Sequence, residues 1–215
     1  MSEEEELARV IPVLAMLARS RFPVPISVDT SKAAVARAAL DAGAALVNDV
    51  RALADPEMAR VVAAAGAPVV LMHTRGSPRD MRERANYVDV VGEVRAELAA
   101  AMARAEAAGV RRDRIVLDPG IGFAKTAGQS VEVLARLPEL LSLGRPLLVG
   151  PSRKSFIGAI TGAPPEERLP GTLAAVTAAV LGGATFLRVH DVAASRQAAR
   201  VGAALRASGQ SGANA

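Results

Sequence analysis

The sequence contains no cysteine and no tryptophan, and it is poor in aromatic residues generally. Phe, Tyr and Trp make up 2% of its 215 residues, whereas hydrophobic residues make up 51%. Without cysteine, the chain can form neither disulfides nor cysteine-ligated metal sites. A core with many alanines and few aromatic rings favours helices packed closely on a sheet over an all-β architecture.

Long apolar runs and basic clusters are also lacking. No stretch approaches about 18 uninterrupted apolar residues, and the acidic opening MSEEEE holds no apolar signal core. The net charge of +4 comes from arginines spread along the chain, without a basic run interleaved with aromatics. Nucleic-acid binding is therefore not indicated. We expect a soluble, cytoplasmic protein that binds neither membranes nor nucleic acid.

Lysine is the scarce cation of this chain. Three of the 26 lysines and arginines are lysines, and each follows closely on an expected strand: Lys32, Lys125 and Lys154. A chain that uses arginine elsewhere keeps lysine where a compact point charge is useful. The segment LLVGPSRKSFIG runs from an apolar strand into a turn that presents Arg153 and Lys154. This turn suits an anionic or carbonyl-rich ligand, and solvated loop charges are the alternative.

Short apolar strands alternate with helical segments along the whole chain. Such alternation without a linker predicts one α/β domain with a parallel sheet and right-handed crossovers. The domain covers residues 1–207, and the tail 208–215 is expected to be disordered. The expected strands are residues 26–29, 45–48, 69–72, 115–118, 147–149 and 186–189. Helices are expected at 3–18, 32–41, 55–65, 88–108 and 131–140, up to 181, and at 193–207.

A polar or charged residue stands at the carboxyl end of every expected strand. In a (βα) barrel these ends meet on one face, where active sites lie. A doubly wound sheet would bring together only the strands at its switch point. We therefore predict a TIM (β/α)8-type barrel, represented here by six strand–helix units. The strand-end residues are Asp29, Asn48 with Asp49, His73, Asp118, Arg153 with Lys154, and Arg188 with His190.

These strand-end residues suggest a specific chemistry. Carboxylates at Asp29 and Asp118 with the amide of Asn48 could bind the donor-rich edge of a flat heterocycle, although such carboxylates also cap helices. Arg188 and His190 are two residues apart, so in a strand they would share a face and could hold an anion. An ion pair and a satisfied core histidine are the alternative. With two histidines and no cysteine, a zinc site is disfavoured.

Seven motifs of this chain resemble those of the dihydropteroate synthase family in order and in position at strand ends. They are SVDTSK (27–32), NDV (48–50), MHTRGSP (72–78), LDPGIGFAKT (117–126), GPSRKSFIG (150–158), ERLPGTLAA (167–175) and RVHDV (188–192). The resemblance covers almost the whole chain. It implies a transferase of folate biosynthesis that joins 6-hydroxymethyl-7,8-dihydropterin pyrophosphate to 4-aminobenzoate and releases pyrophosphate. Sulfonamides would compete with 4-aminobenzoate.

The resemblance also assigns roles to residues. It implies Mg²⁺ with the pyrophosphate, a homodimer, and catalytic roles for Lys154, Arg188 and His190. In the substrate site, Ser155 and Phe156 would border the aminobenzoate, and Arg188 and His190 would face the pterin and the leaving pyrophosphate. The residues that the resemblance places at the pterin are Asp29, Asn48, Met72, Asp118 and Lys154.

The chain also departs from the family pattern. Two strand–helix units that open the family's barrel have no counterpart here, which corresponds to about 60 residues at about 30 per unit. The six units would then be strands 3 to 8 of an incomplete barrel, and we expect the chain alone to be poorly active, prone to oligomerise or incompletely folded. A pterin-binding module without synthase activity is one alternative. A folate-dependent methyltransferase is another, which the SRKS and RVHDV segments disfavour.

Overall fold

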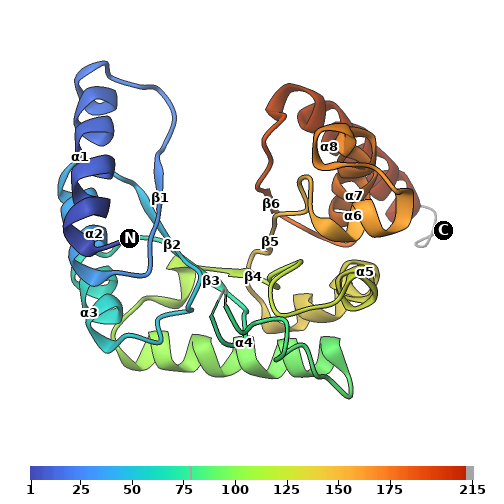
Figure 1. Ribbon diagram of the computed structural model, residues 1–215, viewed down its shortest axis with the longest axis horizontal. Coiled ribbons are helices and arrows are strands. Elements are labelled where there is room, and N and C mark those ends of the chain that lie inside the picture. Colours follow the sequence, from blue (N-terminus) through green and yellow to red (C-terminus); the bar gives the residue numbers. More distant parts are fainter. Residues whose placement is uncertain (78, 212–215) are drawn as a thin grey trace. The chain divides into compact units, whose positions relative to one another are not determined.

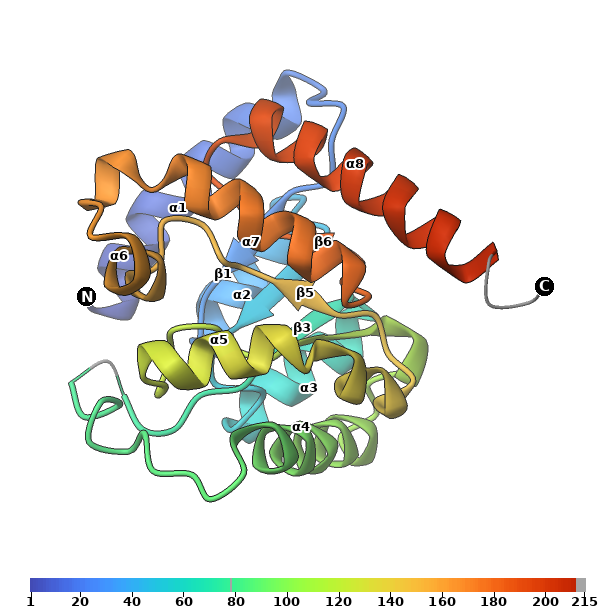
Figure 2. The same ribbon diagram turned by 90° about the vertical axis from the view of Figure 1, so that its right-hand side faces the viewer.

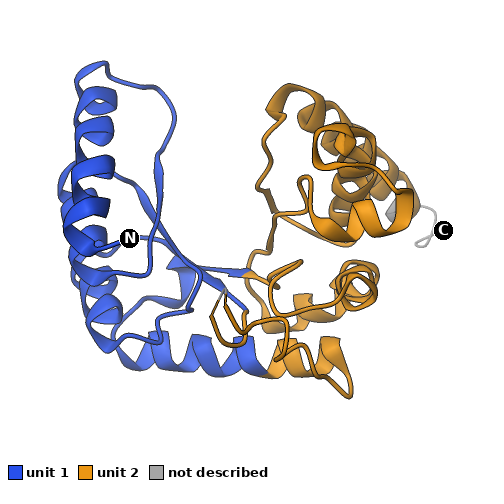
Figure 3. Cartoon of the chain, in the orientation of Figure 1, with its two compact units in different colours: residues 1–73, 97–117 blue, residues 74–96, 118–215 orange. Residues whose placement is uncertain are grey.

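The computed structural model describes residues 1–77 and 79–211, and these form two compact units. Unit 1 contains residues 1–73 and 97–117, and unit 2 contains residues 74–96 and 118–215 (Figure 3). The single domain expected over residues 1–207 stays a prediction.

Unit 1 is a parallel sheet with helices after its strands (Figure 1). The strand order is β1-β2-β3-β4, and Ser27 pairs with Leu46 and Val47 with Val69 in parallel register. β3 is buried along its whole length, as a strand covered on both faces requires. The elements that lie wholly or mostly in unit 1 are α1 (Glu3–Arg19), β1 (Ser27–Asp29), α2 (Ala33–Asp41), β2 (Leu46–Asp49), α3 (Pro56–Ala65), β3 (Val69–Met72), α4 (Val90–Ala107) and β4 (Ile115–Asp118). The first residues of α4, up to 96, and Asp118 of β4 belong to unit 2.

Local signals explain where the helices of unit 1 begin and end. The Ser2 hydroxyl accepts from the N–H of Glu5 and caps α1, whose first turn is acidic. Asp55 caps α3 by accepting from Glu57, and Gly66 ends that helix in the left-handed conformation. α2 packs between α1 and α3. The helices therefore hold β1 and β2 with their carboxyl ends at one edge of the sheet.

Unit 2 contains a second parallel pair of strands and the carboxyl-terminal helices. β5 pairs with β6 through Leu148–Phe186 and Val149–Leu187, and α7 packs against α8 (Figure 2). The elements are α5 (Ala127–Ala135), β5 (Leu148–Val149), α6 (Ser155–Thr161), α7 (Leu169–Leu181), β6 (Phe186–Leu187) and α8 (Val192–Ser211), with 3-10 helices at Leu137–Leu143 and Pro165–Glu167; a further 3-10 helix, Arg112–Arg114, belongs to unit 1.

The alternation of strands and helices is confirmed, and the described residues contain the six expected strands. Residues 69–72 and 115–118 agree with the prediction at both ends. The α/β class with parallel pairing is thus confirmed. Closure into a barrel stays a prediction, because the pairings form a four-stranded and a two-stranded sheet.

Four expected elements differ in the structure. The helix expected at 131–140 is instead α5 (Ala127–Ala135), which begins at the Thr126 capping box, and a separate 3-10 helix at Leu137–Leu143, because Pro138 lacks the N–H that would continue the α-helix.

The helix expected from residue 32 begins at Ala33 and its N-cap residue, Lys32, makes no side-chain cap hydrogen bond; the N–H of Lys32 donates to the hydroxyl of Thr30 over 3.2 Å. The last helix extends to Ser211, beyond the start of the tail expected to be disordered, since each added residue continues an established hydrogen-bond ladder. Residues 212–215 lie outside the described part of the chain. The last strand ends at Leu187, two residues earlier than expected.

No helix in the described part of the chain is both long enough and apolar enough to span a membrane.

Candidate active site

The carboxyl ends of β1 and β2 bring Asp29 and Asn48 together. The two residues are in register in the parallel pair, and Asn48 Nδ2 donates to Asp29 Oδ2 over 2.8 Å. Asn48 is 4% exposed, and its Oδ1 is buried without a hydrogen-bond partner. A buried, unpaired acceptor in a native protein calls for an explanation, and a ligand that donates an N–H would supply one.

Asp49 has a structural role, although it neighbours Asn48. Its carboxylate accepts from the N–H groups of Arg51 and Leu53 over 2.9 and 2.8 Å, and so it folds the loop that follows β2. Burial raises the pKa of Asp49, against the lowering effect of these hydrogen bonds. Successive strand residues point to opposite sides, so Asn48 faces Asp29 while Asp49 holds the loop that follows the strand.

A charged network holds the loop after β1. Glu6 of α1 is 6% exposed, and its carboxylate accepts from the hydroxyl of Thr30 and from Nζ of Lys32. The N–H of Thr30 donates to the carbonyl of Asn48 over 3.1 Å. Burial acts to raise the pKa of Glu6, but the hydrogen bonds from Lys32 and Thr30 outweigh it, so the pKa lies below its ordinary value. Glu6 is thereby linked to the residues beside Asp29.

Sequence reasoning missed Glu6. It stands in a run of four glutamates at a helix start, where acidic residues normally face water and favour the helix dipole. A signal was available in the helical period, because Glu6 lies eight residues before Leu14 and so shares its helix face; these two are the buried residues of α1.

Met72 and His73 follow β3 in unit 1. Met72 is buried, and its contact with a ligand stays a prediction. His73 is also buried, with Nε2 at 3.0 Å from Glu97 Oε2. His73 is thus engaged with a side chain of α4.

In unit 2, Asp118 is the buried acid of the candidate site. It is 2% exposed, accepts from the N–H of Gly120 over 2.7 Å, and lies 3.7 Å from Nη2 of Arg188. Burial raises the pKa of Asp118, against the lowering effect of the Gly120 N–H and the charges of Arg188 and Lys154. The carboxylate is therefore costly to keep ionised in the absence of further donors.

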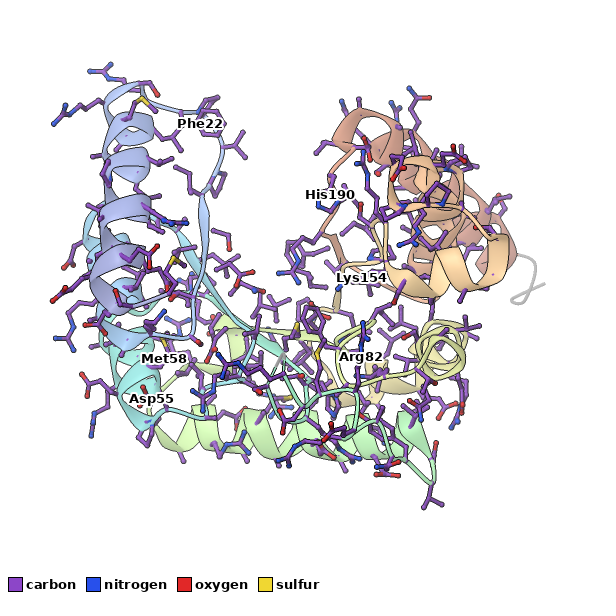
Figure 4. All side chains as sticks on the ribbon, viewed as in Figure 1. Phe22, Asp55, Met58, Arg82, Lys154 and His190 are labelled. Atoms are coloured by element: carbon purple, nitrogen blue, oxygen red, sulfur yellow. The ribbon has the colours of Figure 1, made fainter. Side chains whose placement is uncertain are left out.

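Lys154, labelled in Figure 4, lies over the aromatic ring of Phe123. Its Nζ is 3.9 Å from the centre of the Phe123 ring, a cation–π contact. A Cβ on Gly122, whose φ is +77°, would lie 3.2 Å from Cδ of Lys154, so glycine leaves room for the lysine stem. Burial lowers the pKa of Lys154, and Arg188 adds to this, whereas Asp118 opposes it.

The three lysines have different partners. Lys32 pairs with Glu6, and Lys125 donates to the carbonyls of Gly120 and Phe123 and so closes the glycine-rich loop. Lys154 is the lysine that lies with Asp118 and Arg188. One of the three lysines, Lys154, is therefore a candidate to bind a ligand. The other two, Lys32 and Lys125, hold loops in place.

The loops after β5 and β6 are joined to each other. Arg153 forms a bidentate pair with Asp191, and Ser152 Oγ lies 2.8 Å from Nδ1 of His190. The prediction that Arg188 and His190 share one face of a strand is wrong, because β6 ends at Leu187 and neither residue lies in a strand. Arg188 instead lies near Asp118.

Ser155 and Phe156 begin α6, directly after Lys154. Ser155 is exposed and Phe156 is buried. Their position beside an aminobenzoate stays a prediction. In the part of the chain that the structure describes, no three acidic or histidine side chains gather closely enough to hold a metal ion. The residues present therefore do not fit a Mg²⁺ held by the protein alone.

Comparison with known proteins identifies the family. A family model described as "Pterin binding enzyme" matches residues 1–190. The chain belongs to the pterin-binding enzyme family. The resemblance inferred from the seven motifs is thereby confirmed at the level of the family.

Relatives in this family are dihydropteroate synthases. The enzyme of Synechocystis sp. is 50% identical over 207 residues, which cover 95% of this chain and 71% of the relative. The Escherichia coli enzyme is 46% identical over 201 residues, which cover 94% of this chain and 71% of the relative.

Solved structures of this family share the fold. The Yersinia pestis dihydropteroate synthase in a sulfonamide drug complex is 41% identical with a TM-score of 0.93, over 97% of this chain and 76% of that one. The Xanthomonas albilineans enzyme with 7,8-dihydropteroate is 45% identical with a TM-score of 0.89, and the match covers 96% of this chain and 76% of that one.

Proposed function

We propose that this chain is a dihydropteroate synthase, which transfers the dihydropterin methylene group from pyrophosphate to the amine of 4-aminobenzoate. The observation that carries this function is the match to synthases at 46–50% identity along nearly the whole chain. The Xanthomonas albilineans relative has been solved with 7,8-dihydropteroate and with 4-aminobenzoic acid. The chain is accordingly a transferase of folate biosynthesis.

The unpaired oxygen of Asn48 supports a role in pterin binding. A pterin edge carries ring N–H and amino groups, which need acceptors in a buried site. Asn48 Oδ1 is such an acceptor, and Asp29 supplies a carboxylate beside it. Asp118 offers a second carboxylate, which is buried whereas Asp29 is exposed, and two parallel N–H donors would stabilise its ionised form. In this assignment Met72 adds an apolar contact to the ring.

The cations of unit 2 support a role toward the leaving group. In the proposed step the arylamine nitrogen forms a bond to the pterin methylene carbon, while the carbon–oxygen bond to pyrophosphate breaks and its electrons leave with the pyrophosphate. Lys154, Arg188 and His190 stabilise that departing anion. The nitrogen then loses a proton to solvent. Because the amine is itself the nucleophile, the protein has to align the two substrates and supplies no covalent intermediate.

The remaining assignments rest on the family resemblance. Ser155 and Phe156 border the aminobenzoate, and a sulfonamide occupies that position in competition with it. The protein acts as a cytoplasmic homodimer of an incomplete barrel whose six strands correspond to strands 3 to 8 of the family. Mg²⁺ enters with the phosphate oxygens that it prefers, and no step above depends on it.

Pyrophosphate release tests the function. The purified chain is given dihydropterin pyrophosphate with and without 4-aminobenzoate, and pterin binding is measured separately by fluorescence. A synthase releases pyrophosphate only when both substrates are present, and sulfonamide suppresses that release. Binding of pterin without release supports the non-catalytic pterin-binding module. If the reading frame continues upstream, the longer chain is assayed in parallel. Turnover by the longer chain and none by the 215-residue chain would support both the synthase function and the expected poor activity of the shorter chain.

A further inference from the structure

Two loops of unit 2 are cross-linked through two adjacent residues on each. Ser152 and Arg153 follow β5, and His190 and Asp191 follow β6. Ser152 Oγ accepts from the backbone N–H of His190 over 3.3 Å and lies 2.8 Å from its Nδ1. We call these four residues the loop latch. The latch joins the loop that carries Lys154 to the loop that carries Arg188.

The guanidinium of Arg153 is committed to Asp191. Nη2 donates to both carboxylate oxygens over 2.9 Å, and Nε donates to Oδ2 over 3.2 Å. The sequence places Arg153 beside Lys154 as if both cations faced one ligand. The structure separates their roles, because the fork that Arg153 would offer to an anion is already occupied by a carboxylate.

The backbone of Arg153 is held as firmly as its side chain. Its φ is +55°, which is unusual for a residue with a Cβ. Its N–H donates to Thr172 Oγ1 over 3.0 Å, and its carbonyl accepts from Nη1 of Arg168 over 3.2 Å. The next N–H, that of Lys154, closes a tight turn onto the Pro151 carbonyl. Any movement of Arg153 therefore moves Lys154.

Asp191 stands on the other loop with no competing use of its carboxylate in the contacts described. Both oxygens accept from Arg153, while its backbone carbonyl accepts from the N–H of Ser195 in the first turn of α8. Its neighbour His190 has Nδ1 at Ser152, so Nε2 is the ring nitrogen that remains for other contacts. The ring orientation thus depends on the latch.

We propose that Asp191 is a positioning residue, which through Arg153 fixes Lys154 and His190 in their working geometry. This inference rests on the proposed synthase function for its kinetic consequence. Rotamer-rich cations that are held in advance lose less freedom when the reaction begins, and misplacement by about 1 Å costs about 100-fold in rate. In this proposal Asp191 acts through Arg153, to which both of its carboxylate oxygens are bound.

Asp191→Asn and Arg153→Lys are the test variants. Asparagine keeps the size of the side chain and favours a helix start, but it removes the charge that Arg153 meets. Lysine keeps the charge and removes the planar fork. We expect kcat for pyrophosphate release to fall about 10- to 100-fold in each, with KM little changed. The kcat of the double variant is expected to be no lower than that of the less active single variant, because the two residues act as one unit.

Asp113→Asn is the matched control. Asp113 also pairs with an arginine, Arg111, over 2.6 Å, but both side chains are more than half exposed. We expect this variant to keep wild-type turnover. Thermal unfolding of all variants is recorded alongside, so that a loss of rate is read against the amount of folded protein.

A second readout does not depend on turnover. The chain has two histidines, so ¹⁵N signals of both imidazole rings can be resolved by NMR, with His190→Gln as the assignment variant. Asp191→Asn is expected to shift the ring signals of His190 and to leave those of His73 unchanged, and Asp113→Asn is expected to move neither. This arm stands even if the wild-type chain releases no pyrophosphate, a result that would count against the synthase function alone.

Two results would overturn the inference. One is a folded Asp191→Asn variant with kcat within about twofold of wild type and unchanged His190 signals. The other is a double variant whose losses multiply, because that would show separate roles for Arg153 and Asp191. Either result would reduce the latch to an ordinary surface ion pair.

Discussion

Glu6 offers a sharp test of how the amino-terminal helix supports the candidate site. Glu6→Gln keeps an oxygen that can accept from Thr30, but it removes the charge that Lys32 meets. A hydrogen bond to a charged group contributes roughly 1.5–3 kcal/mol. Since Lys32 remains 32% exposed, we discount the loss in unfolding free energy to about 1–2 kcal/mol. For a chain of this size that lowers Tm by about 2–8 °C.

Glu5→Gln is the control, because Glu5 lies one residue away and forms an exposed pair with Arg9. We expect its effect on the unfolding free energy to stay within about 0.5 kcal/mol. Both variants are compared by urea unfolding with the wild type, at equal protein concentration. The ranking of the two glutamates then reports burial and not helix propensity, which is the same for both positions.

The pH dependence gives this prediction its sign. The folded pKa of Glu6 lies below its ordinary value, so the carboxylate stabilises the fold above the unfolded pKa of about 4.3. That stabilisation is lost as the pH falls through the folded pKa. The difference in unfolding free energy between wild type and Glu6→Gln should therefore become smaller at acid pH. A gap that stays constant down to acid unfolding, or a Glu5→Gln effect as large as that of Glu6→Gln, would refute the reasoning.

Three further predictions concern the strand-end residues. Asn48→Leu removes an unpaired buried acceptor but also the Nδ2–H that donates to Asp29, so the unfolding free energy should fall by about 0.5–1.5 kcal/mol, whereas pterin binding measured by fluorescence titration on the folded variant should be abolished; retained binding would argue against the site. Gly122→Ala should destabilise by about 1 kcal/mol because φ is +77° and should lower turnover by crowding Lys154, which kinetics and thermal unfolding check together. Asp118→Asn should lose turnover but stabilise the fold, increasingly as pH rises from about 4 toward neutral, because burial raises the folded pKa of Asp118; urea unfolding at several pH values would contradict this by showing a constant or negative difference.

Local patterns in the sequence were sufficient to locate the strands and the residues at their ends. β3 was predicted correctly at both ends because four apolar residues stand between clear turn signals. The Asp29–Asn48 contact also follows from the sequence, since parallel strands in register bring their carboxyl ends together. These features depend on neighbours within a few residues or on a single parallel pairing.

Partners distant in sequence were beyond such reasoning. The hydroxyl of Thr30 donates to Glu6, which lies 24 residues earlier, and nothing in the residues around Thr30 indicates that partner. Arg153 was expected beside Lys154 at a ligand, but it meets Asp191, which lies 38 residues later. A side chain with several possible partners goes to the one that tertiary packing brings close, and no local period encodes that choice.

The two faces of β2 have a consequence for insertions and deletions in this chain. Asn48 meets Asp29, while Asp49 folds the next loop through two backbone hydrogen bonds. A change of one residue in the turn between α2 and β2 that slid the strand by one position would exchange their sides. A carboxylate would then face Asp29, where two like charges repel, and an amide would be left to hold the loop. The length of that turn should therefore be far less variable among functional descendants of this chain than the identity of its residues.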